Sequence, residues 1–170
     1  VENLFKHQIF KKYENSFEII AVKTVSKESG ISVPSKNIWL DTAVQSNFDT
    51  FYSERYLTTL HTKLLHAQLE NIPYQHIIIL ANTNVYGGGG ILNSYSLTTT
   101  KNKEFAPVVV HEFGHSFAGL ADEYYYESDV LDNTYPHNVE PWEPNITTLV
   151  DFSAKWKDML SAGTAVPTNI

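Results

Sequence analysis

The sequence predicts an α/β fold, in which a mixed, twisted sheet is flanked by a long backing helix and by a second helix that carries two histidines. Two runs have the composition of strands that share a sheet, "HIIILANT" and "ILNSYSLTTT". Two other runs have helical spacing or helical end signals, "SNFDTFYSERYLTTLHTKLLHAQLENIP" and "APVVVHEFGHSFAG". We therefore expect one sheet with both helices packed against it.

The composition is that of a globular protein. The chain has 170 residues, 42% of them hydrophobic and 13% aromatic, so we expect a single domain over residues 1–170 with a core of its own. The formal charge of −7 argues against a nucleic acid or an anionic membrane surface as the main partner. There is no cysteine to form a disulfide, and no run approaches the about 18 apolar residues of a transmembrane segment. The oligomeric state stays unknown from composition.

The first half of the chain is predicted to contain a short helix, a strand and the long backing helix. The short helix is expected within residues 1–16, and the β-branched run over residues 17–26 is expected to be a strand. Large side chains recur every three or four positions within residues 46–73, which predicts an amphipathic helix that ends before Pro73. These side chains are Phe51, Tyr52, Arg55, Tyr56, Leu60, Leu64, Leu65 and Leu69.

The middle of the chain is predicted to form a strand pair followed by a helix. Residues 76–83 are a continuous apolar run, and residues 86–100 are typical of a glycine turn followed by a Thr-rich strand. Pro107 suits the first turn of a helix over residues 106–119, because its missing N–H has no partner there. Gly119 permits a left-handed cap that ends this helix.

The last part of the chain is predicted to be mostly irregular. Residues 129–145 are rich in proline and polar side chains, and residues 149–163 suit one more short helix or turn. The end at Ile170 carries no stop signal, so we expect the domain to be incomplete at its C-terminus.

The helix expected over residues 106–119 carries the motif H-E-x-x-H. On a helix that turns about 100° per residue, His111 and His115 lie one turn apart on one face and can bind the same metal ion. Zinc is the ion expected, because it lowers the pKa of bound water to about 7. Glu112 lies beside the pair and can act as general base. The motif thus predicts hydrolysis of a peptide bond by zinc-bound water, with Glu112 passing the proton to the leaving amine.

A catalytic zinc needs a third protein ligand and one open position. The segment "GLADEY" can supply this ligand, since Gly119 lets the chain turn back and an acidic pair follows. Asp122 is the preferred ligand, and Glu123 remains its rival.

Three segments of the chain have a shared family pattern: "YGGGG", "HEFGHSFAGLADEY" and "PNITTLVDFSAKWK". Together they resemble the IgA peptidase family of bacterial zinc metallopeptidases. The resemblance implies a metzincin-like zinc peptidase domain with one zinc ion per chain and a protein or peptide substrate. It also implies an exported protein, located outside the cell, on its surface or in the periplasm. Carried over residue by residue, it implies His111 and His115 as zinc ligands, Glu112 as general base and Asp122 as third ligand.

Two features depart from the metzincin pattern H-E-x-x-H-x-x-G-x-x-H/D. Gly119 and Asp122 each lie one residue farther from His115 than that pattern places them, which keeps Glu123 as a rival ligand. The only methionine, Met159, lies in a segment that looks more helical than turn-like, so it is not assigned to a methionine turn.

Two other functions share parts of the pattern. A catalytically silent, metal-stabilised binding module for a glycoprotein or host protein would have a closed shell of four protein ligands, and the intact Glu112 argues against it. A metal-dependent deformylase or amidase would normally take its third ligand from a distant cysteine, which this chain lacks.

Three further motifs have simpler interpretations beside functional ones. The run "YGGGG" is an ordinary glycine turn or a loop that leads into an edge strand for an extended substrate. The run "NIT" at Asn145 matches a glycosylation acceptor, but in a bacterial protein it indicates only a turn. One of four tyrosines could stabilise an oxyanion, although packing is favoured: Tyr124, Tyr125, Tyr126 and Tyr135.

Overall fold

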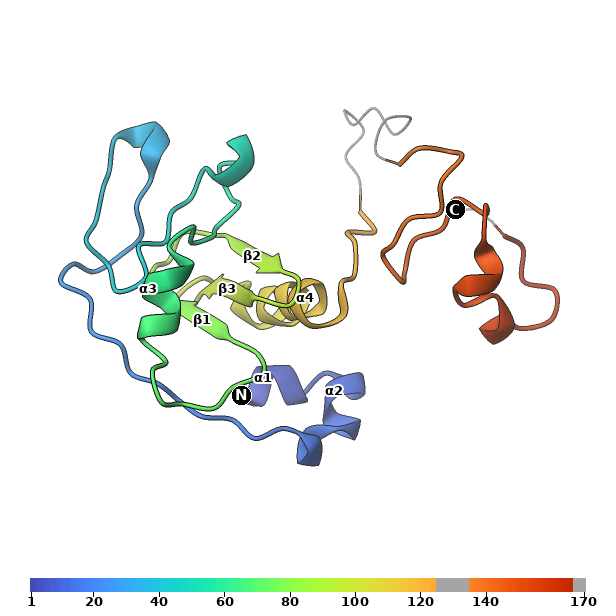
Figure 1. The fold of residues 1–170 in the computed structure, drawn as a ribbon, viewed down its shortest axis with the longest axis horizontal. Helices are drawn as coiled ribbons and strands as arrows, with labels where there is room; N and C mark the ends of the chain where they lie inside the picture. The colour runs from blue at the N-terminus through green and yellow to red at the C-terminus, as the bar shows by residue number, and fades with distance from the viewer. Residues whose placement is uncertain (125–134, 167–170) are drawn as a thin grey trace. The chain divides into compact units, whose positions relative to one another are not determined.

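The computed structural model describes residues 1–124 and 135–166. The chain divides into two compact units, Val1–Ala118 and Gly119–Ile170 (Figure 1). Within the described residues, no helix is long and apolar enough to cross a membrane.

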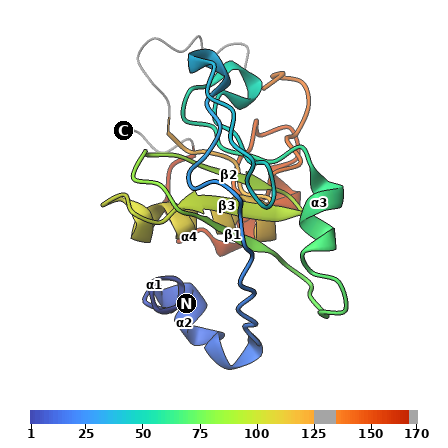
Figure 2. The same ribbon diagram turned by 90° about the vertical axis from the view of Figure 1, so that its left-hand side faces the viewer.

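The first unit is built on a small mixed sheet, as the sequence predicts. Its strands are β1 (Ile78–Ala81), β2 (Gly88–Ile91) and β3 (Tyr95–Thr99), in the order β1-β3-β2 (Figures 1 and 2). The central strand β3 runs parallel to β1 and antiparallel to β2. The two runs predicted to share a sheet are therefore confirmed as β1 and β3. The glycine run is more than a turn, because three of its glycines form most of β2.

One face of the sheet covers the main apolar core. The short helix α3 (Thr62–Ala67) contributes Leu65 to this core. The hydroxyl of Tyr95 donates to the carbonyl of Thr59 at 2.7 Å and accepts from its N–H at 2.9 Å, so the buried phenol has its polar partners. The buried members of the core are Ile31, Phe48, Leu57, Leu65, Ile77, Ala81, Tyr95 and Leu97.

The predicted helix that carries the motif is confirmed as α4 (Phe105–Ala118). It packs against β2 and β3, with Gly88 and Gly90 of β2 facing the helix and Gly89 facing Leu57 of the main core. Pro107 lies in its first turn. Gly119 follows its last residue with φ of 65°, the left-handed cap that the sequence predicts.

The predicted N-terminal helix is present as two short ones, α1 (Glu2–Phe5) and α2 (Gln8–Lys12). Their apolar side chains pack around Phe113 of α4 in a second cluster, which includes Leu4, Phe5, Phe10 and Phe17. The predicted strand over residues 17–26 is wrong, since these residues pair with no strand and most are exposed. Their β-branched composition reflects a preference that forms a strand only where a neighbour offers pairing and burial.

The predicted long backing helix is also wrong. Only α3 within residues 46–73 is α-helical. Residues before it instead pair with other segments: the N–H of Leu57 donates to the carbonyl of Gly88 at 2.9 Å, which extends the sheet beyond β2. Tertiary pairing therefore overrides the helical spacing. Four residues within residues 46–73 also have left-handed backbone conformations, which an α-helix does not allow: Asp49, Phe51, Tyr52 and Asn71.

The second unit contains two single-turn 3-10 helices, η5 (Phe152–Ala154) and η6 (Lys157–Met159). They confirm the short helix or turn predicted over residues 149–163. Between them, the ammonium of Lys155 donates to the backbone carbonyls of Pro141 and Glu143, the latter at 2.7 Å. The irregular stretch predicted over residues 129–145 lies partly outside the described residues, and its described part contains no helix or strand.

Candidate metal centre

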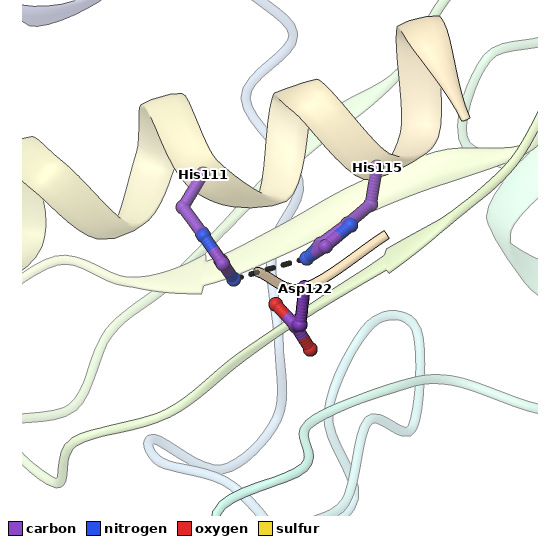
Figure 3. Close-up of side chains that lie close together, drawn as sticks. All are labelled: His111, His115 and Asp122. Carbon is purple, nitrogen blue, oxygen red and sulfur yellow. Dashed lines mark hydrogen bonds between the residues drawn. The ribbon is translucent and has the colours of Figure 1, made fainter. Parts of the chain in front are cut away.

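The two histidines of the motif converge on one point beside α4. Their Nε2 atoms lie 3.0 Å apart, and their rings meet edge to face with centroids 4.4 Å apart (Figure 3). Two nitrogens that bind one tetrahedral ion at about 2.0–2.1 Å are separated by about 3.3 Å. The observed pair is close to that separation, and His111 is exposed while His115 is half-buried. The geometry therefore fits two ligands of one solvent-accessible metal ion.

Glu112 lies between α4 and strand β2 rather than in open solvent. The residue is only 9% exposed. A Cβ atom placed on Gly88 would lie 2.8 Å from both Cγ and Cδ of Glu112, and closer still to Oε1. The carboxylate thus occupies the space that the missing side chain of Gly88 leaves. This close packing gives the predicted general base a defined position on the sheet.

The glycines of β2 explain how α4 approaches the sheet so closely. A Cβ atom on Gly90 would lie 2.7 Å from Cβ of His115 and would overlap the backbone carbonyl of Glu112. Gly88 and Gly90 point to the helix, while Gly89 points to the other face. The sequence interpretation of "YGGGG" missed this role, although glycine inside a strand signals close approach of another element.

The outer edge of β2 is occupied at Gly88. The N–H of Leu57 donates to the Gly88 carbonyl, and a Cβ atom on Gly89 would overlap the carbonyl of Leu57. An extended substrate therefore finds no free strand edge at Gly88. The interpretation that the glycine run leads into an edge strand for a substrate therefore does not apply at Gly88.

His76, to which the sequence assigns no role, packs against the buried side of α4. Its Nε2 lies 3.0 Å from the hydroxyl of Ser116, and its ring meets Phe113 and Phe117 edge to face. Burial lowers the pKa of His76, which favours the neutral ring. The contact lies on the face of α4 away from the motif histidines and fixes the rotation of the helix. No local sequence signal could reveal it, because the two partners are far apart in the chain.

The first acidic residue after α4 is Asp122. His111, His115 and Asp122 each offer one ligand atom, and these atoms lie within 4.8 Å of one another, so the three residues form a group that could hold a metal ion (Figure 3). The rival residue Glu123 has a different partner: its Oε1 accepts a hydrogen bond from Nδ2 of Asn145 at 2.8 Å.

The tyrosines that follow are only partly described. Tyr124 is exposed, and Tyr125 and Tyr126 lie outside the described residues. The hydroxyl of Tyr135 donates to Oε1 of Glu143 at 3.3 Å. Burial, then the negative charges of Glu143 and Asp122, raise the pKa of Tyr135 and keep its proton in place. The described contacts of Tyr135 are therefore those of a packed side chain, as the sequence interpretation favours.

Comparison with known proteins agrees with the resemblance carried by the motifs. The family described as IgA Peptidase M64 matches residues 1–170, the full length of the sequence. No curated protein matches the chain. The family match therefore covers α4, the strands below it and the segment that contains Asp122.

Proposed function

The chain belongs to the IgA peptidase M64 family of metallopeptidases, and from this we propose that it is a zinc-dependent endopeptidase with a metzincin-like catalytic domain. The observation that carries the proposal is the pair of Nε2 atoms 3.0 Å apart on α4, next to a buried Glu112. A structural metal site needs no carboxylate held beside its ligands. This arrangement therefore supports catalysis over a purely structural role for the ion.

The donor set proposed for zinc is His111, His115 and Asp122. Two imidazole nitrogens and one carboxylate oxygen are ligands that suit zinc, and three protein ligands leave one position open for substrate or water. When bound, the ion supplies a Lewis acid that polarises the scissile carbonyl and lowers the pKa of water. Glu123 is a weaker candidate for the third ligand, because its carboxylate is hydrogen-bonded to Asn145.

Glu112 is proposed to move the proton. Its carboxylate takes a proton from the attacking water and later delivers it to the nitrogen of the leaving amine, so the peptide bond breaks without a charged amide anion. General base catalysis of this kind contributes about 10²- to 10⁴-fold to the rate. The packing of Glu112 against Gly88 holds the base in place without a rearrangement at each turnover.

The proposed substrate is a protein or peptide. The family takes its name from immunoglobulin A, but the residues of this site carry no feature that selects that protein, so the proposal extends only to peptide bonds. The proposed activity is hydrolysis of these bonds and not peptide binding alone.

The test uses the zinc-loaded chain and a peptide library, with cleavage products read by mass spectrometry. Wild type should cleave peptides, lose activity when zinc is removed and regain it when zinc is returned. Glu112→Ala should keep one zinc ion per chain and lose about 10²-fold or more in rate. Glu70→Ala, a change at an exposed glutamate of the same unit, should leave the rate unchanged.

Two results would contradict the proposal. Cleavage by Glu112→Ala at the rate of wild type would remove the base from the mechanism. Tight zinc binding by wild type without any cleavage would instead favour the metal-stabilised binding module.

A further inference from the structure

Asn145 contacts both sequence neighbours of Asp122. Its Oδ1 accepts a hydrogen bond from the N–H of Ala121 at 2.8 Å, and its Nδ2 donates to the carbonyl of Ala121 at 2.9 Å. The same Nδ2 donates to Oε1 of Glu123 at 2.8 Å. All three contacts lie within the second unit. One side chain amide therefore fixes the residues on both sides of the proposed third ligand.

These contacts replace the secondary structure that this segment lacks. Residues 119–124 belong to no helix or strand, so no backbone ladder holds them. The paired bonds to the N–H and carbonyl of Ala121 have the pattern that a neighbouring strand would supply. A segment held in this way loses less conformational entropy when Asp122 binds an ion, because its backbone is already ordered.

The amide also separates the two acidic side chains. Nδ2 of Asn145 attracts the carboxylate of Glu123, while the carboxylate of Asp122 belongs to the group that could hold a metal ion. Without this contact, Asp122 and Glu123 would be two similar carboxylates competing for one ion. Asn145 therefore bears directly on which of them becomes the ligand.

Asn145 is itself supported by a fixed loop. The ammonium of Lys155 donates to the carbonyls of Pro141 and Glu143, which lie four and two residues before Asn145. A charged donor shared between two carbonyls restrains this stretch of backbone. The support thus runs from Lys155 through the loop to Asn145 and on to the segment of Asp122.

We propose that Asn145 is a positioning residue that presents Asp122, and not Glu123, to the zinc ion; the inference rests on the proposed function. The hydrogen bonds of Asn145 also decide how the "NIT" motif is interpreted. Each hydrogen of the Asn145 amide donates to a protein acceptor, so a sugar attached to Nδ2 would displace one of them. The amide is therefore used inside the protein rather than as a glycosylation acceptor.

The test measures zinc affinity by competition with a chromophoric chelator. Wild type should bind one zinc ion, and Asn145→Ala should bind it about 10- to 100-fold more weakly, the usual effect of losing a group that orients a metal ligand. Asn138→Ala, a change at an exposed asparagine of the same unit, is the matched control and should bind zinc like wild type.

Two variants that change Glu123 test whether its hydrogen bond with Asn145 determines the zinc affinity. Glu123→Gln should stay close to the affinity of wild type, because its side chain oxygen still accepts from Asn145. Asn145→Asp places two carboxylates against each other and should weaken binding at least as much as Asn145→Ala. Adding Glu123→Gln to Asn145→Asp restores a donor and an acceptor across the contact and should recover at least about twofold in affinity.

Each failure has a distinct meaning. If Asn145→Ala is folded and binds zinc as tightly as wild type, the positioning role is wrong and the proposed function stands. If Asn145→Ala is unfolded by circular dichroism, the double variant decides, and a double variant no better than Asn145→Asp alone overturns the inference. If Glu123→Gln loses zinc, Glu123 is the ligand and the inference is also overturned. If wild type binds no zinc, it is the proposed function that fails.

Discussion

Alanine at Gly88 would place a methyl group where the carboxylate of Glu112 now lies. The added Cβ would be 2.8 Å from Cγ and Cδ of Glu112, whereas ordinary contacts lie at 3.4–4 Å. The carboxylate must therefore move by about 0.6 Å or more, or α4 must lift away from β2. A shift of the carboxylate displaces the proposed general base relative to the proposed ligands His111 and His115, and a shift of α4 displaces all three from strand β2.

The expected loss follows from this displacement. A catalytic group misplaced by about 1 Å costs about 10²-fold in rate, so Gly88→Ala should lower kcat/KM by roughly that factor. Overpacking of a close contact also costs about 1–3 kcal/mol of unfolding free energy. Zinc binding should be retained, because the methyl group lies against Glu112 and not against the imidazoles of His111 and His115.

The assay compares Gly88→Ala with Gly89→Ala, its neighbour in the same strand. A Cβ on Gly89 would meet the carbonyl of Leu57 on the opposite face, away from Glu112. Both variants should lose stability in thermal unfolding. Only Gly88→Ala should lose kcat/KM for peptide cleavage when both are measured zinc-loaded, at a temperature where both are folded.

Wild-type kcat/KM in folded Gly88→Ala would refute the reasoning that this packing positions the base. Equal losses of kcat/KM in the two variants would refute it as well, because the effect would then come from the strand as a whole.

Three further results are expected. His115→Ala should lose the one zinc ion expected for wild type by elemental analysis, and zinc should raise the melting temperature of wild type but not of this variant; retained zinc would exclude His115 as a ligand. A chelator should lower the melting temperature of wild type in proportion to the zinc removed; an unchanged melting temperature would argue that the ion does not bind the folded chain selectively. Burial lowers the pKa of His76, so the stability this residue contributes is present above pH about 6.5 and is lost as the pH falls below it. Metal-free His76→Gln should therefore lose less stability than metal-free wild type between pH about 7 and about 5, and equal pH slopes would contradict this.

The parts of the fold that could be predicted from the sequence are those determined by residues close together in the chain. Helix α4 follows from Pro107, the apolar run after it and the glycine that follows its last residue, all of which lie in or next to the helix. The convergence of His111 and His115 follows from their spacing of four on a helix, which needs no knowledge of the rest of the fold. The strands β1 and β3 were likewise visible in composition.

The parts that could not be predicted depend on residues far apart in the chain. Leu57 lies within the stretch that the spacing predicts as a helix, but its N–H donates to the carbonyl of Gly88 and its side chain is part of the main core. Local spacing cannot weigh such pairing against a helix, because the energy of the pairing comes from another segment.

The same limit applies to the supports of the candidate site. The contacts of His76 with Ser116 and of Asn145 with Ala121 each join segments more than twenty residues apart. The sequence therefore indicates the chemistry of the site, which is local, and misses the packing that positions it.

The most direct test of the account is a crystal structure of the zinc-loaded chain, with anomalous data at the zinc absorption edge. We expect one ion bound by Nε2 of His111 and His115 at about 2.0–2.1 Å and by a carboxylate oxygen of Asp122 at about 2.0–2.2 Å, with one position left open to solvent. Zinc bound elsewhere, a ligand from Glu123 in place of Asp122, or a shell closed by four protein ligands would contradict it.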